Sequence, residues 1–80
     1  MNLKQAVKER DEAFIDLVQT GSMKKLRKYA RKYGVVIPKS ERVAKAGVYK
    51  AVQRCTNIPQ EIKDKAFDEC IKLGFSPYMN

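Results

Sequence analysis

The stretch "SMKKLRKYARKYGVVIPKSE", residues 22–41, contains the pattern that decides the fold. Apolar side chains recur three and four positions apart in its first half, which is the spacing of one face of an α-helix. Ser22 is placed to cap the start of this helix, and Gly34 suits a left-handed end. Pro38 then keeps the helix from resuming before Ser40 opens another. The stretch therefore predicts a helix, an extended link and a second helix.

The same apolar spacing continues on both sides of this stretch, and no segment alternates polar and apolar residues long enough to predict a strand. We expect an all-α, compact four-helix single domain over residues 1–80. The four predicted helices cover residues 2–20, 22–33, 40–55 and 59–73. A chain of this length buries only about 60% of the surface that its unfolded form exposes, so a deep active-site cavity is not expected.

Small residues decide which helix is expected at the centre. Ala44, Gly47 and Ala51 lie on the apolar arc of the predicted helix 40–55 and would let another helix approach closely. That helix is therefore expected to be the central one. Val35, Val36 and the isoleucine after them, in the link, are expected to fill the gap between neighbouring helices, with a short strand as the alternative.

Arg10 interrupts the apolar stripe of the first predicted helix. A buried arginine is costly unless it is paired. We expect the first two turns of this helix to project past the body of the protein. Arg10 would then reach solvent or pair with an acid of the helix at 59–73. The alternative places Arg10 in a groove for a partner.

The composition gives little support for catalysis or metal binding. The chain has no histidine, which removes the commonest general base and a common metal ligand. Cys55 and Cys70 are separated by a spacing that matches no zinc or redox motif, and no Gly-rich phosphate loop is present. We expect no enzyme activity, no metal and no cofactor. Both cysteines are predicted to be buried, reduced thiols, with a disulfide between their helices as the alternative.

No apolar run approaches the roughly 20 residues that a membrane span requires, and the N-terminus has no apolar signal-peptide core. The sequence therefore predicts a cytoplasmic protein without a membrane partner. Association of the helix at 22–33 with a membrane surface is a less favoured alternative, because its apolar side chains are needed for the core.

Positive charge is concentrated in the middle of the chain. Residues 23–54 contain eleven basic residues and one acid, a formal charge of +10, whereas the whole chain carries +8. At 100° per residue, six cations fall on one uninterrupted arc of the helix at 22–33. A merely solvated face, which remains the alternative, usually interleaves Glu with Lys. We therefore expect an anionic partner.

The expected partner is DNA or RNA, bound without catalysis. The six cations of the first arc are predicted to contact phosphates, and four residues of the next helix to read or stack on bases. The arrangement is reminiscent of a helix-turn-helix, although the seven-residue link "GVVIPKS" exceeds the usual turn. The phosphate-contacting residues are Lys24, Lys25, Arg27, Lys28, Arg31 and Lys32, and the reading residues are Arg42, Lys45, Tyr49 and Lys50.

Three segments, "LRKYARKYGVVIPKS", "AGVYKAVQRCT" and "LGFSP", together resemble small uncharacterised helical proteins encoded in prophages. The resemblance implies a phage or mobile-element source but no specific activity. Small phage products often act on host nucleic-acid machinery or host defence. The alternative function is therefore a protein–protein interaction module, such as a phage adaptor or an inhibitor of a host nucleoprotein or defence complex. A homodimer is a further possibility, because so small a core gains from association.

Overall fold

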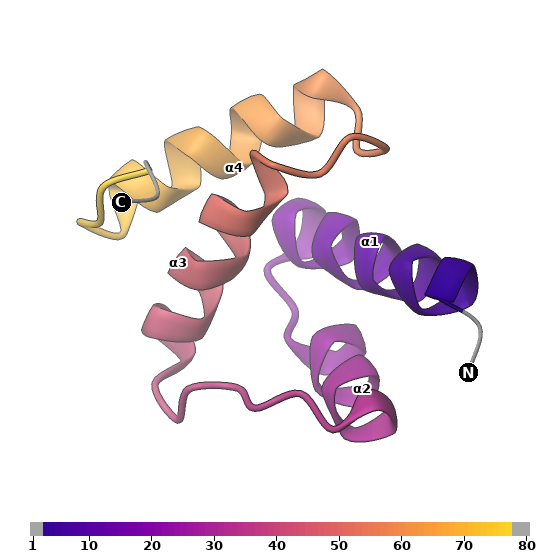
Figure 1. The fold of residues 1–80 in the computed structure, drawn as a ribbon. Helices are drawn as coiled ribbons and strands as arrows, with labels where there is room; N and C mark the ends of the chain where they lie inside the picture. Colours follow the sequence, from indigo (N-terminus) through magenta and orange to yellow (C-terminus); the bar gives the residue numbers. More distant parts are fainter. Residues whose placement is uncertain (1–2, 78–80) are drawn as a thin grey trace.

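A computed structural model describes residues 3–77 of the chain. These residues form four α-helices, which are α1 (Leu3–Thr20), α2 (Lys24–Tyr33), α3 (Glu41–Val52) and α4 (Gln60–Lys72) (Figure 1). No strand occurs within residues 3–77. The prediction of an all-α, four-helix chain is thus confirmed. The predicted start of the first helix at Asn2 lies outside the described residues.

The ends of α2 and α4 follow the glycine signals of the sequence. Gly34 and Gly74 have φ angles of 68° and 87°, in the left-handed region that favours glycine. The amide of Val35 donates a hydrogen bond to the Ala30 carbonyl at 2.9 Å, which completes the predicted helix ending. After Gly74, the ring of Phe75 folds back and packs against the core, as predicted.

The starts of the helices agree with the sequence less closely. The Ser40 hydroxyl accepts a hydrogen bond from the Val43 amide at 3.3 Å and caps α3, as predicted. Helix α2 begins at Lys24, so Met23 occupies the position directly before it. The Ser22 hydroxyl accepts a hydrogen bond from the Lys24 amide at 3.2 Å, the backbone bond that was expected of Ser22 at this helix start. Helix α3 also ends at Val52, earlier than the predicted residue 55.

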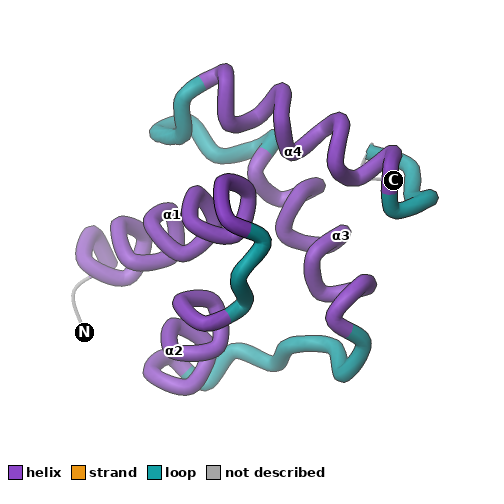
Figure 2. The backbone as a smooth tube through the Cα atoms, turned by 180° about the vertical axis from the view of Figure 1, so that it is seen from behind, coloured by secondary structure: helices purple, strands orange, loops and turns teal. Residues whose placement is uncertain are grey.

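The helices are arranged around α1, which packs against each of the other three (Figures 1 and 2). Helix α3 packs against α4 and α1, but no Cα atom of α2 lies within 8 Å of a Cα atom of α3. The prediction that α3 is the central helix is therefore wrong. Gly47 also does not provide a close helix contact, because no neighbouring atom lies within 4 Å of the position its Cβ would occupy.

All four helices contribute to one core. Its largest fully buried side chains are Leu17 from α1, Val52 from α3 and Cys70 from α4. Cys55 and Cys70 are both free, buried thiols, which confirms the preferred prediction over the disulfide. Burial raises the pKa of both thiols. They therefore stay protonated and are poor nucleophiles at neutral pH.

The first turns of α1 project beyond the body of the protein, as predicted. Leu3 is 74% exposed, and Val7 is exposed as well. Arg10 does not pair with an acid of α4. Its guanidinium instead forms an ion pair with Asp11 at 3.0 Å and lies 5.8 Å from the centre of the Phe14 ring. Within residues 3–77, no helix combines the length and the apolar character that a membrane crossing requires.

Candidate nucleic-acid interface

Helix α2 has one buried side and one cationic side. Leu26 and Ala30 are buried, and they hold the helix in place so that its opposite side faces solvent. All six cations predicted to contact phosphates are exposed on α2, and these are Lys24, Lys25, Arg27, Lys28, Arg31 and Lys32. We call these six residues the α2 basic face.

Carboxylates of α1 border one edge of the α2 basic face. Lys32 Nζ lies 2.7 Å from Glu9 Oε1, and Lys25 Nζ lies 3.9 Å from Asp16 Oδ1. The Tyr33 hydroxyl also donates a hydrogen bond to Glu9. Because Lys32 and then Tyr33 donate hydrogen bonds to the ionised carboxylate, the pKa of Glu9 is lowered to about 2. Lys25 and Lys32 are therefore partly neutralised and attach α2 to α1.

The other four cations of the α2 basic face have no such pairing. No carboxylate among residues 3–77 lies within 4 Å of the charged groups of Lys24, Arg27, Lys28 or Arg31. At 1.5 Å per residue, these four extend over about 10 Å along the helix. Arg31 also lies in the last turn of α2, where the helix dipole favours a cation. The helix dipole therefore gives a structural reason for a cation at Arg31. It gives no such reason for Lys24, which lies in the first turn.

The predicted base-reading role of Tyr49 is wrong, because this side chain belongs to the core. Tyr49 is only 4% exposed. Its pKa is raised by burial first and by the nearby Glu69 carboxylate second, which places the phenol beside α4. One turn further along α3, Gln53 Nε2 donates a hydrogen bond to the Lys63 carbonyl of α4 at 2.8 Å. This polar side of α3 therefore packs on α4.

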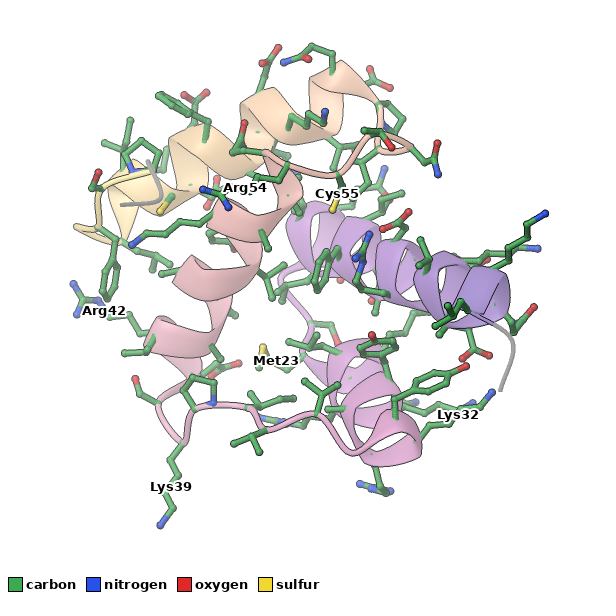
Figure 3. All side chains as sticks on the ribbon, in the orientation of Figure 1. Met23, Lys32, Lys39, Arg42, Arg54 and Cys55 are labelled. Carbon is green, nitrogen blue, oxygen red and sulfur yellow. The ribbon has the colours of Figure 1, made fainter. Side chains whose placement is uncertain are left out.

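Arg42 is also occupied at the end of α4. Its Nε donates a hydrogen bond to the Leu73 carbonyl at 3.0 Å, and its guanidinium lies 4.6 Å from the centre of the Phe75 ring. Figure 3 shows Arg42 and Lys32 on opposite sides of the molecule. The predicted contribution of Arg42 to a surface shared with α2 is therefore wrong.

The remaining two predicted residues of α3 are also engaged within the chain. Lys45 Nζ lies 3.6 Å from Glu41 Oε1, four residues earlier on the same helix. Lys50 Nζ lies 5.8 Å from the centre of the Phe75 ring. The structure thus places six of the ten predicted residues together on the α2 basic face, whereas the other four lie on α3, which has no Cα atom within 8 Å of α2. The close helix pair of a helix-turn-helix is also absent here, because no Cα atom of α2 lies within 8 Å of a Cα atom of α3.

A groove opens where the link was expected to fill the gap between helices. Of the three apolar link residues, only Ile37 packs against the core. Val35 is 46% exposed and Val36 is 92% exposed. The resulting groove has a volume of about 250 Å³ and is lined by α1, α2, the link and α3. The sequence did not indicate this groove, because the length of the link does not reveal how far apart α2 and α3 lie.

Residues 3–77 contain no group of three or more Cys, Asp or Glu side chains arranged to hold a metal ion. The chain matches no protein-family model, and comparison with curated proteins and with solved structures found no significant match.

Proposed function

We propose that this chain is a non-enzymatic protein that binds DNA or RNA in the cytoplasm through the α2 basic face. The observation that supports the proposal is the set of four exposed, carboxylate-free cations at Lys24, Arg27, Lys28 and Arg31. They belong to residues 23–54, a segment with eleven basic residues and one acid. Such a concentration attracts the phosphate backbone and releases its counterions on binding.

The proposed binding does not depend on base sequence. Contacts to phosphates position a protein on nucleic acid, whereas contacts to base edges specify the sequence. Of the α3 residues that were expected to reach bases, Tyr49 is buried and Arg42 and Lys50 lie against the end of α4 or Phe75. The fourth residue, Lys45, pairs with Glu41 of the same helix. Affinity is therefore expected to vary little among oligonucleotides of different sequence and equal length.

Four phosphate contacts set the expected salt dependence. With duplex DNA, the slope of log K against log salt is then about −3.6. Between 50 and 200 mM salt, this slope gives a loss of about a hundredfold in affinity. A surface of six to ten contacts would lose about 10³–10⁵ over the same range. The slope measured by fluorescence anisotropy with a labelled duplex therefore reports how many cations contact phosphates.

A pair of double variants tests the location of the binding surface. Arg27→Gln with Lys28→Gln removes two cations from the α2 basic face, and Lys8→Gln with Lys72→Gln removes two from α1 and α4. Both variants carry the same net charge. We expect the first variant to bind at least tenfold more weakly in low salt and to halve the salt slope, and the second to bind almost as wild type.

Two outcomes of this experiment would reject the proposal. One is the absence of binding by the wild-type chain to duplex DNA, single-stranded DNA and RNA in low salt. The other is an equal loss of affinity in the two double variants, which would indicate general charge attraction without a surface on α2.

The second candidate function is binding of a host protein or a nucleoprotein complex, as expected of a phage adaptor or inhibitor. The observation that favours it is the apolar groove between α2, the link and α3. Contacts to phosphates would not use the apolar side chains that line this groove. Nuclease treatment separates the two candidates, because only a protein-mediated complex survives digestion of the nucleic acid.

A further inference from the structure

A small hollow lies between α1 and α2, at the edge of the α2 basic face. Its volume is about 270 Å³, which is below the roughly 300–1,000 Å³ of pockets for drug-sized ligands. Each wall consists of residues three and four positions apart, so each wall is one side of a helix. The charged and aromatic lining residues are Lys25, Lys28, Tyr29 and Lys32 of α2, and Glu9 and Glu12 of α1. We call this hollow the notch.

The charged groups of the notch are only partly paired within the chain. Lys32 and Lys25 lie 2.7 and 3.9 Å from carboxylates of α1. Among residues 3–77, no ion pair or side-chain hydrogen bond engages Lys28 or Glu12. The notch therefore presents one unpaired cation and one unpaired carboxylate beside the ring of Tyr29.

Tyr29 gives the notch an aromatic surface. The side chain is half-buried, and it lines both the notch and the apolar groove. The centre of its ring lies 5.1 Å from that of the Tyr33 ring, so a second aromatic side chain supports it. Part of the ring thus stays accessible from the notch. An accessible aromatic ring between cations is the arrangement on which unpaired bases stack in proteins that bind single strands.

The charges around the notch restrict what it can hold. A phosphate inside it would lie near the carboxylates of Glu9 and Glu12, which repel it. A cationic group would meet three lysines. An uncharged, planar group avoids both repulsions and can stack on Tyr29. Lys28 lines the notch and is also one of the four carboxylate-free cations, so a phosphate bound at Lys28 lies next to the opening.

We propose that the notch holds one unpaired base of a single-stranded nucleic acid. The base would stack on Tyr29, and the adjoining phosphates would lie on Lys28 and on Lys24, one turn earlier on α2. This inference rests on the proposed nucleic-acid binding and names single strands as its substrate. A base inside a duplex enters such a pocket only after unstacking and unpairing. Stacking accepts every base, so it agrees with binding that does not depend on sequence.

Two labelled strands of equal length and charge test the notch in the full chain. One is a single-stranded DNA oligonucleotide, and the other has the same sugar–phosphate backbone without bases. Fluorescence anisotropy measures both affinities. We expect wild type to bind the strand with bases more tightly by about fivefold or more, which is the lower end of what stacking contributes per base.

Two substitutions of one residue link this preference to the notch. Tyr29→Leu removes the aromatic ring but keeps an apolar side chain, and Tyr29→Phe is the matched variant that keeps the ring. We expect Tyr29→Leu to lose the preference for the strand with bases and Tyr29→Phe to retain it. Both variants should bind a DNA duplex as wild type does, because the duplex contacts only the cations of the α2 basic face. Circular dichroism verifies that both keep the helical fold.

Tyrosine fluorescence gives a second readout, because the chain has no tryptophan. A base that stacks on Tyr29 should quench the emission of its phenol. We expect the strand with bases to quench wild-type emission and the strand without bases to leave it unchanged. Tyr29→Phe lacks the reporting phenol and should show less quenching at saturation, although its affinity is retained.

Three results would overturn the base pocket. Wild type binds the two strands equally, Tyr29→Leu keeps the preference for bases, or Tyr29→Leu loses affinity for the duplex and the single strand alike. The last result would mean that Tyr29 only positions α2. These failures differ from a failure of the proposed function. If neither strand nor the duplex binds, nucleic-acid binding itself is rejected, whereas equal binding of both strands rejects the pocket alone.

Discussion

Lys32 Nζ lies 2.7 Å from Glu9 Oε1, so an ion pair joins α2 to the helix on which the whole fold is built. The Tyr33 hydroxyl donates to the other oxygen of the same carboxylate. Together with the buried Leu26 and Ala30, these contacts orient α2 about its axis. One edge of the α2 basic face is held against α1, and the carboxylate-free cations are directed to solvent. The proposed interface therefore depends on a carboxylate that would never touch the nucleic acid.

Replacing Glu9 should reveal this attachment through its pH dependence. The pKa of Glu9 is about 2 in the folded chain, below its ordinary value of 4.5. Ionisation therefore favours the folded state, and this contribution is fully present above pH 4.5 and is lost as the pH falls toward 2. We expect Glu9→Gln to have a lower thermal unfolding midpoint than wild type at pH 7. The difference should shrink steadily between pH 4.5 and pH 2.

The matched control for this prediction is Glu12→Gln, which removes an exposed carboxylate of the same helix. No hydrogen bond or ion pair holds Glu12 in the described structure, so this variant should follow the wild-type midpoint at every pH. A difference between Glu9→Gln and wild type that stays constant from pH 7 to pH 2 would contradict the assigned role of Glu9.

Substitutions at Tyr49 test whether this side chain serves the core or stacks on bases. Because it is buried beside α4, Tyr49→Ala should cost about 3–5 kcal/mol, a large share of the 5–15 kcal/mol that stabilises a typical domain. Tyr49→Phe keeps the ring and should change stability little. Urea denaturation measures both effects. Nucleic-acid affinity of Tyr49→Phe should equal that of wild type, and a decrease would place the phenol at the interface after all.

The contrast between α2 and α3 shows how far the sequence predicts this site. Helix α2 is buried on one side only, so its apolar arc and its cationic arc separate cleanly on a helical wheel. That separation made the six exposed cations predictable. The pairing of Lys32 with Glu9 and of Lys25 with Asp16 was not predictable, because the spacing along the sequence does not say which edge of α2 meets α1.

The prediction for α3 was wrong because this helix is buried on several sides. Ala44 and Val48 follow the expected apolar arc, but Ala46 and Tyr49 are buried as well. Tyrosine can be placed on either side of an apolar boundary, since its ring is apolar and its hydroxyl is polar. The long polar side chains of Arg42 and Gln53 reach backbone carbonyls of a helix distant in the sequence. Such tertiary contacts have no periodic signature.

Two glycine substitutions should change stability in opposite directions. Gly47 lies within a helix and faces open space, so Gly47→Ala should stabilise the chain by about 0.5–1 kcal/mol through helix propensity. Gly34 has a φ of 68°, and Gly34→Ala should cost about 1–2 kcal/mol because a Cβ strains this conformation. Thermal unfolding should show the two midpoints on either side of wild type. A decrease for Gly47→Ala would mean that α3 needs the glycine for its own packing.

Arg42 offers a test that separates a structural arginine from a nucleic-acid contact. Its planar guanidinium donates to the Leu73 carbonyl at the end of α4 and stacks over Phe75, and a lysine ammonium cannot do both. Arg42→Lys should therefore lower stability by about 1 kcal/mol. Because the charge is retained and the residue lies away from the α2 basic face, affinity for a DNA duplex should not change.

Lys45→Gln is the comparison for Arg42→Lys on the same helix. Lys45 pairs only with Glu41, one turn away, and such surface pairs contribute about 0.3–0.5 kcal/mol. Urea denaturation should rank Arg42→Lys as the more destabilised of the two, because it alone weakens the contact between α3 and the end of α4. If Arg42→Lys instead keeps full stability and loses affinity for the duplex, Arg42 belongs to the binding surface, and that surface extends beyond α2.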